Sequence, residues 1–495
     1  MHQFWATIKQ PFVLDLRALA LLRMGTATVV LLDLAIRSTD LEAHYSNSGV
    51  LPVAALVEHA WTPYQFSLHA SSGLWQIEAL LFALAALVAL ALLIGYHTRL
   101  ATLASWVLLV SLQNRNPLID QGGDDLLRML LFWGFFLPWG RIWSRDAHTQ
   151  APPPTHDYCS AATIAYIVQL ALLYWCTAIL KSGREWTHDG TALYYALSLD
   201  QLLLPGGRLL YPHPDLLRFL TFTTWYTELL LPFALFIPFK VAWWRLLVIS
   251  VLAIFHIGIS LTLFVGLFFL INFVSLLALL PPILLDLLTT QVAQRTVWPQ
   301  NLKPRLPTWQ LPWQISIVRT NVFPSAVAYV MKEAIVLFSL VYICWWNIDD
   351  LFSKSNHWMS ASTRWVGYLF RLDQHWGMFA QTVFKDDGWF ILEGTTTKGQ
   401  LLSLTHPCSP LSYAKPKAIV KQFKNDRWRK YSENYLFVDN IWMRPYYCNY
   451  FLRIWHQGHF RPPLKRITIV YMKEVSLPDY KLSKPEREVL YDCAP

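Results

Sequence analysis

Residues 74–96 read LWQIEALLFALAALVALALLIGY, and no charged residue follows Glu78 in this stretch. An α-helix rises 1.5 Å per residue, so about 20 such residues cross the hydrocarbon core of a bilayer. The apolar run is continuous, whereas a half-buried strand or a barrel strand alternates apolar and polar residues. The stretch therefore predicts a membrane-spanning helix.

Eight further apolar segments occur along the chain. The full set of predicted spans is 16–36, 74–96, 100–112, 125–139, 161–180, 216–238, 242–263, 266–288 and 322–346. The third and fourth are short and the last carries two charged residues, so each of these three also fits a re-entrant or interfacial position. We expect an all-α polytopic membrane domain with about eight or nine transmembrane helices.

The charged residues are unevenly distributed. Of the 41 Lys and Arg and 32 Asp and Glu residues, 20 and 18 lie in residues 1–347, which leaves 21 and 14 for residues 348–495. The second region is much the shorter, so its charge density is that of water-exposed protein. We expect a membrane domain over 10–290, a connector with the last transmembrane helix over 291–347, and a soluble domain over 348–495.

The C-terminal region shows strand patterns. Residues 389–394 and 401–404 flank a turn that contains Gly399, which predicts a hairpin, and 467–475 predicts another strand. Residues 446–456 fit a short helix. We therefore expect the soluble domain to be small and β-rich. Three cysteines, Cys408, Cys448 and Cys493, allow one disulfide there if the domain faces an oxidising compartment.

The distribution of basic residues predicts the orientation. If the N-terminus is cytoplasmic, the inner segments carry ten Lys and Arg residues and the outer loops five, as the positive-inside rule requires. Nine spans then place residues 348–495 on the periplasmic or extracellular side of the plasma (bacterial inner) membrane. The net charge of +9 contains no long basic run, so we expect lipid headgroups and not nucleic acid as its counterpart.

Polar residues that hydrocarbon should not tolerate gather toward the outer side under this orientation. They are His44, Tyr45, Asn114, Asn116, Asp124, Lys181, Trp186, Glu228 and His256. Their convergence predicts one cavity that opens outward. Desolvation would leave the Lys181 amine uncharged, and an uncharged amine takes a proton from a phenol or hydroquinone. His256 and the asparagines would then hydrogen-bond the anion.

Each of these residues also has a purely structural alternative. Lys181 at a helix end can extend to the headgroups, and Asp124 can pair with Arg128 four residues on. Glu228 can bridge two helices, and His256 can be a hydrogen-bonded packing residue. No Cys/His cluster with metal-ligand spacing is present in the sequence, so no metal site is expected.

Three motifs resemble the HTTM domain, the membrane domain shared by vitamin K-dependent gamma-carboxylase and many bacterial relatives. They are DLEAHYSNSGVLP at 40–52, QNRNPLIDQGGD at 113–124 and FHIGIS at 255–260. The resemblance covers about residues 10–290. The segments DQHWGMF at 373–379 and DGW at 387–389 are similar to a C-terminal extension of bacterial HTTM proteins.

The stretch ILKSGREW at 179–186 resembles the carboxylase segment around its base lysine. The resemblance implies that Lys181 is the catalytic base, with Trp186 at matching spacing and His256 on a carboxylase histidine. Asn116 or Pro117 stands where the carboxylase has its catalytic histidine. The implied reaction is epoxidation of a reduced, vitamin K-like quinone, with O2 and CO2 as co-substrates, with or without carboxylation.

We therefore expect Lys181, His256 and Asn116 as catalytic residues. The expected substrate-binding residues are His44, Tyr45, Asn114, Asp124, Trp186 and Glu228. The expected partners are membrane lipid and a lipophilic small molecule. The alternative is a non-enzymatic protein that binds lipid or docks a protein partner through residues 348–495.

Overall fold

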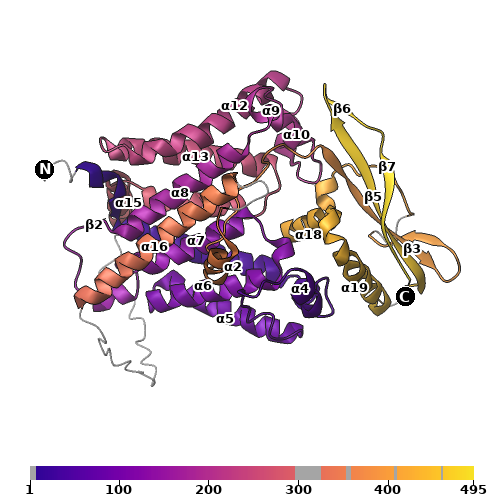
Figure 1. Cartoon of the computed structure of the whole chain (residues 1–495), viewed down its shortest axis with the longest axis horizontal. Helices are drawn as coiled ribbons and strands as arrows, with labels where there is room; N and C mark the ends of the chain where they lie inside the picture. The colour runs from indigo at the N-terminus through magenta and orange to yellow at the C-terminus, as the bar shows by residue number, and fades with distance from the viewer. Residues whose placement is uncertain (1–6, 296–324, 353–357, 406–409, 459–460, 495) are drawn as a thin grey trace.

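A computed structural model describes residues 7–295, 325–352, 358–405, 410–458 and 461–494. Long helices packed side by side form the larger part, and a smaller unit of helices and strands covers one end of them (Figure 1). The start of the described chain, drawn in indigo, lies at the opposite end of the molecule from the C-terminal strands. The Pro-rich part of the predicted connector, 299–312, lies outside the described residues.

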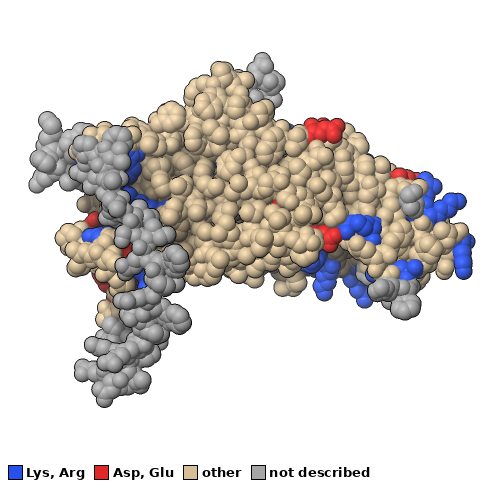
Figure 2. Space-filling view, turned by 90° about the horizontal axis from the view of Figure 1, so that it is seen from below, with Lys and Arg blue, Asp and Glu red and all other residues tan. Residues whose placement is uncertain are grey.

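Six helices in the described ranges are long and apolar enough to cross a membrane. They are α2 (Leu16–Ser38), α5 (Trp75–Ile94), α8 (Ala161–Leu180), α12 (Pro214–Leu230, continued by a 3-10 turn to Phe236), α13 (Val241–Thr262) and α16 (Ser325–Phe352). On the face shown in Figure 2 the broad middle of the molecule carries few charged side chains, which gather toward the two ends. These features indicate a helical membrane protein, as predicted.

The predicted count of eight or nine spans is not confirmed. Helix α7 (Gly122–Phe136) has only 15 residues, and α6 (Thr98–Arg115) ends in the polar run Gln113–Arg115. Helices α14 (Phe268–Leu276) and α15 (Pro282–Arg295) belong to a pair bent by 96°, which counts as one span at most. The described residues therefore give six candidate spans, or up to seven.

Helix α2 carries a buried arginine that terminates α5. The guanidinium of Arg23 donates hydrogen bonds to the carbonyls of Leu92 (2.7 Å) and Leu93 (2.9 Å), which are among the last carbonyls of α5 and have no partner within the helix. Gly95 then ends α5 with a φ of 70°, and a Cβ there would lie 2.4 Å from the Arg23 guanidinium. Glycine is therefore required at this helix end.

Short helices connect the long ones. They are α3 (Leu41–Tyr45), α4 (Val53–His59), α9 (Arg184–Thr187), α10 (Ala192–Ser198) and α11 (Pro205–Leu210). The two-residue strands β1 (Leu14–Asp15) and β2 (Asp157–Tyr158) pair antiparallel and tie the start of α2 to the start of α8. Figure 1 shows α4, α9 and α10 at the end of the bundle that faces the C-terminal unit.

The C-terminal unit contains an antiparallel sheet. Its strands are β3 (Asp386–Thr396), β4 (Leu401–Ser403), β5 (Leu464–Leu477), β6 (Lys481–Leu482) and β7 (Glu486–Cys493). Strand β3 pairs with β4 and β5, and β5 pairs with β6 and β7. The predicted hairpin and third strand are confirmed. A disulfide joins Cys448 to Cys493, whereas Cys408 lies outside the described residues.

Helix α17 (Ala361–Phe370) lies against α16, where Tyr342 donates to the carbonyl of Thr363. Two further helices complete the C-terminal unit: α18 (Asp426–Leu436) and α19 (Arg444–Gln457). The last contains the predicted helix 446–456. Tyr431 and Tyr435 of α18 and Leu452 of α19 belong to the same buried apolar cluster as the membrane helices. These side chains of α18 and α19 are buried together with those of the membrane helices, so the C-terminal unit packs directly onto the end of the bundle.

Candidate functional site

A cavity of about 350 Å³ lies between helices α8, α12 and α13. Most of its wall is apolar, and the C-terminal unit contributes Met378 and Phe379. The polar side chains on the wall belong to Tyr174, Thr177, Lys181, Trp186, Thr223, Thr224, Thr227, Glu228, His256 and Thr262. We call this cavity the chamber. Its size and its few convergent polar groups are typical of small-molecule sites.

Lys181 and Glu228 form an ion pair on the chamber wall. Helix α8 ends at Leu180, so the next residue turns out of the helix, and the Lys181 Nζ donates to both Glu228 carboxylate oxygens at 2.7 and 2.5 Å. Each residue is 4% exposed. The Trp186 ring centroid lies 4.6 Å from the same Nζ, a cation–π contact.

This pair changes two sequence expectations. Lys181 does not extend to the headgroups, because its side chain is buried and bound. The amine was expected to be desolvated and uncharged, but a carboxylate faces it directly, since Glu228 bridges α12 to the end of α8. An amine and a carboxylate in contact share their protons, so the pair acts as one acid–base unit.

His256 is another polar residue on the chamber wall. Its Nε2 lies 2.9 Å from the hydroxyl of Tyr174, and the side chain is almost completely buried. The Nδ1 atom has no hydrogen-bond partner among the described residues. A buried ring nitrogen without a partner is costly, so this atom is available to an oxygen of a bound molecule.

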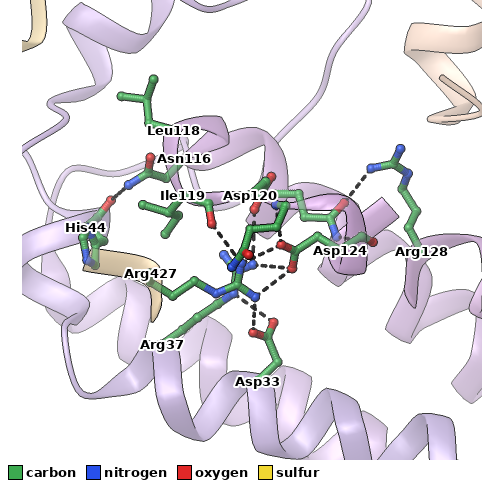
Figure 3. Close-up of polar contacts among 12 residues, drawn as sticks. Asp33, Arg37, His44, Asn116, Leu118, Ile119, Asp120, Asp124, Arg128 and Arg427 are labelled. Carbon is green, nitrogen blue, oxygen red and sulfur yellow. Dashed lines mark hydrogen bonds and ion pairs between the residues drawn. The ribbon is translucent and has the colours of Figure 1, made fainter. Parts of the chain in front are cut away.

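Four of the predicted site residues therefore line one chamber: Lys181, Trp186, Glu228 and His256. The other five do not line it. They are His44, Tyr45, Asn114, Asn116 and Asp124, and they belong to a second buried polar region between the bundle and the C-terminal unit. Figure 3 shows His44, Asn116 and Asp124 in this region. The sequence could not separate the two groups, because under the predicted orientation both lie toward the same side of the membrane, although they belong to different helices.

The second region is a network of two arginines and three carboxylates, which we call the arginine network: Asp33, Arg37, Asp120, Asp124 and Arg427. Asn425 caps α18 by accepting the Trp428 backbone N–H, which places Arg427 in the first turn of that helix. Its guanidinium reaches Asp33 at 2.6 Å and Asp124 at 2.5 Å. Arg37 binds the same two carboxylates, each at 2.8 Å (Figure 3).

The expected pairing of Asp124 with Arg128 is wrong. Asp124 instead accepts the Gln121 backbone N–H as part of a capping box at the start of α7, which orients its oxygens toward the two arginines. Arg128 binds Asp125 at 2.9 Å and the carbonyl of Arg371. Both arginine sites thus connect the bundle to the C-terminal region.

The remaining predicted residues lie near this network. Their side chains have hydrogen-bond partners there, except for the His44 ring, whose two nitrogens have none among the described residues. Asn116 donates to the carbonyl of His44 at 2.9 Å, and Asn114 donates to the carbonyl of Phe66 at 2.8 Å. Tyr45 accepts a hydrogen bond from Arg37. Burial lowers the pKa of His44 to about 3, so its ring is neutral near pH 7. These contacts shape loops and reach no part of the chamber wall.

Several residues that line the chamber were not predicted from the sequence. Tyr174 stands seven residues before Lys181, two helical turns, and that spacing on one face of α8 was a usable signal. Met378 and Phe379 could not be predicted as part of the wall. They lie about 200 positions after Lys181 in the sequence, and only the fold brings them to the chamber. The sequence also did not indicate that Arg427 pairs with Asp33 and Asp124.

No family model matches this chain, and no curated protein or solved structure shows a significant match to it. The class that the fold defines is a helical membrane protein with a C-terminal unit of helices and sheet. What the chamber does must be argued from its own chemistry.

The contact between the sheet and the bundle is expected to depend on pH. Asp387 of β3 is buried and accepts the Asp200 backbone N–H at 2.7 Å, and burial raises its pKa to about 7. The folded state therefore holds a proton that the unfolded chain loses near pH 4, so this group's stabilisation falls as the pH rises from about 4 to about 7, by up to about 1.4 kcal/mol per unit.

The measurement is the free energy of unfolding between pH 4 and 8 for the parent and for Asp387→Asn, which imitates the protonated acid. The difference between the two proteins should grow in favour of the variant across this interval. Parallel curves would show that Asp387 titrates with its ordinary pKa.

Proposed function

We propose that the chamber binds a membrane-soluble small molecule and that the Lys181–Glu228 pair exchanges a proton with it. The observation that carries this proposal is an acid–base pair on the wall of a mostly apolar cavity of about 350 Å³. Buried ionic groups inside a helical bundle are costly, and they are typical of functional sites.

A second cavity supports a lipophilic ligand. An apolar groove of about 650 Å³ runs between α12 and α13, and its wall includes Phe219, Leu230 and Leu247, which are 65%, 57% and 43% exposed. Three residues line both the groove and the chamber: Thr223, Thr227 and Val251. The outer surface of these helices would face lipid, so a molecule dissolved in the bilayer reaches the chamber through this groove.

The polar groups suit a weakly acidic hydroxyl. Together Lys181 and Glu228 carry no net charge, so the pair can accept one proton from a phenol or hydroquinone and become cationic beside the resulting anion. His256 Nδ1 can hydrogen-bond a second oxygen of the ligand. Trp186 supplies an aromatic face next to the amine.

The resemblance at residues 179–186 and 255–260 supports a more specific proposal. We propose an HTTM-type protein that acts on a reduced, vitamin K-like quinone. The reaction consumes one O2 per hydroquinone and yields the epoxide and water, and CO2 would be the co-substrate if a carboxylation follows. Lys181 takes the role of base after passing its own proton to the Glu228 carboxylate, with which it is paired.

A non-enzymatic lipid-binding role is the second candidate. The ion pair between Lys181 and Glu228 satisfies both charges without a ligand, so a purely structural bridge between α8 and α12 is physically complete. In that case a lipid occupies the chamber without being converted, and residues 348–495 supply the docking surface for a partner.

The proposed location is the bacterial inner membrane, with the N-terminus cytoplasmic and the C-terminal unit periplasmic. If α6, α7 and the bent α14–α15 pair each count as a crossing, the described helices make nine. The disulfide between Cys448 and Cys493 suits an oxidising compartment. The start of the described chain and the C-terminal strands lie at opposite ends of the molecule (Figure 1).

The experiment is to purify the protein in its native lipids, identify the co-purifying lipid or quinone by mass spectrometry, and follow hydroquinone epoxidation in the same membranes. Lys181→Met should lower turnover by about 10²- to 10⁴-fold, the usual contribution of a general base. Lys398→Met, in the exposed β3–β4 turn, is the matched control. Bound quinone without turnover favours the lipid-binding role. Turnover in Lys181→Met equal to that of the parent protein would show that Lys181 is not the base.

A further inference from the structure

Residues 377–383, GMFAQTV, form neither helix nor strand, but they are held firmly against the residues that follow Lys181. The Gly183 N–H donates to the carbonyl of Gln381 at 2.9 Å. The indole N–H of Trp186 donates to the carbonyl of Phe379 at 3.0 Å. Glu185 accepts the backbone N–H of Val383 at 3.2 Å. Three hydrogen bonds thus attach this segment to the mouth of the chamber.

An ion pair strengthens the attachment. Glu185 also binds Lys385 at 2.8 Å. The main chain of Gly183 and the carbonyl of Gln381 are so close that a Cβ on Gly183 would lie 2.4 Å from that oxygen. A side chain of any size at position 183 would therefore displace the segment.

The segment has two different faces. Met378 and Phe379 line the chamber, whereas Gln381 and Thr382 are exposed. Phe379 has a φ of 52°, a backbone conformation that residues other than glycine rarely adopt. Such a conformation persists only where surrounding contacts enforce it. Here the hydrogen bond to Trp186 holds the carbonyl of Phe379 while the residue forms part of the chamber wall.

We propose that residues 377–383 are a roof that closes the chamber against water, so that its ligand enters only from the bilayer. The roof covers the end of the chamber next to Lys181, and Thr223, Thr227 and Val251 form the wall toward the lipid-facing groove. The C-terminal unit is thereby part of the site. This inference rests on the proposed function and assigns the ligand class: membrane-soluble amphiphiles are admitted and water-soluble molecules are excluded.

The test measures access to position 177, because Thr177 lines the chamber and is 4% exposed. Thr177→Cys is made in the full-length protein with Cys159, Cys176, Cys344 and Cys408 changed to serine, which leaves the disulfide intact. The protein is placed in lipid nanodiscs and labelled with N-phenylmaleimide, which dissolves in the bilayer, or with the permanently charged MTSET. Lys398→Cys in the exposed turn gives the reference rate for each reagent.

Relative to that reference, we expect N-phenylmaleimide to label position 177 at least about tenfold faster than MTSET, because local opening of the roof is infrequent. Gly183→Ala should raise labelling by MTSET about tenfold and leave the lipid-soluble reagent unchanged. Gly122→Ala is the matched control, since a Cβ there meets no atom within 4 Å. If Gly183→Ala does not fold, Trp186→Phe removes the hydrogen bond to Phe379 and replaces it in the test.

The proposal is overturned if MTSET labels position 177 as readily as the reference site, if neither reagent reaches it, or if neither roof variant changes its protection. The readout involves no quinone. Protection with no hydroquinone turnover would therefore remove the proposed reaction and retain the roof, and free access by MTSET would remove the roof alone.

Discussion

Lys181→Met is expected to destabilise the protein by about 3–5 kcal/mol, because it leaves the Glu228 carboxylate buried without its partner. The free energy of unfolding in detergent or nanodiscs measures the effect. Lys398→Met, at an exposed turn, should change it by less than about 0.5 kcal/mol.

The double variant Lys181→Met/Glu228→Leu should recover most of this loss, since replacing a buried pair by apolar groups of similar size is often neutral. The double variant also separates the two candidate functions. If it folds, retains the bound lipid and shows no turnover, the pair performs chemistry. A double variant as unstable as the single one would show that the pair is not the cause of the loss.

Arg427→Ala is expected to loosen the C-terminal unit from the bundle, at a cost of about 3–5 kcal/mol. The substitution removes one of two guanidinium groups from the arginine network and leaves Asp33 and Asp124 short of a partner in a buried position (Figure 3). Limited proteolysis of residues 348–495, together with thermal unfolding, reports the effect. Arg427→Lys should recover only part of it, because one ammonium cannot replace a fork that contacts both carboxylates.

Arg466→Ala is the matched control, since Arg466 pairs with Asp492 in an exposed position and should contribute less than about 1 kcal/mol. Salt should weaken that surface pair and leave the arginine network almost unchanged. Unaltered proteolysis of Arg427→Ala would mean that apolar packing alone holds the C-terminal unit.

Lys181 and Arg427 belong to two separate sites, the chamber and the arginine network, whose residues the sequence had predicted to share one cavity. The chamber holds an acid–base pair, a histidine with an unpaired nitrogen and an aromatic ring. The arginine network holds ion pairs between the bundle and α18. The chamber has room for a small molecule, which is why a ligand is proposed there. The charges of the arginine network satisfy one another, which is why its role is proposed to be structural.

The helical segments could be predicted because a bilayer demands length and continuous apolarity. Residues 74–96 contain α5 (Trp75–Ile94), and residues 161–180 match α8. The spans predicted at α6 and α7, whose segments are short or polar at their ends, are not among the six candidate spans of the described residues, and the bent pair α14–α15 counts as one span at most. The length of an apolar segment alone does not show where its helix breaks.

Part of the candidate site could also be predicted from the sequence. Lys181 and Glu228 were conspicuous because each is charged within or beside an apolar segment, and the structure places them in contact. Their pairing was not predictable, since it joins residues 47 positions apart on different helices. His44 and Asn116 looked equally suitable, but their loops fold toward α18.

By itself, the amino-acid sequence determined the long apolar helices, the charge-rich C-terminal region with its strands, and the short list of polar residues that needed an explanation. These are local properties of composition and periodicity. Tertiary structure alone decided which polar groups meet, that a carboxylate faces the Lys181 amine, and that Met378 and Phe379 cover the chamber. Such contacts join segments distant in the chain, and their energies depend on burial and distance, which no local pattern encodes.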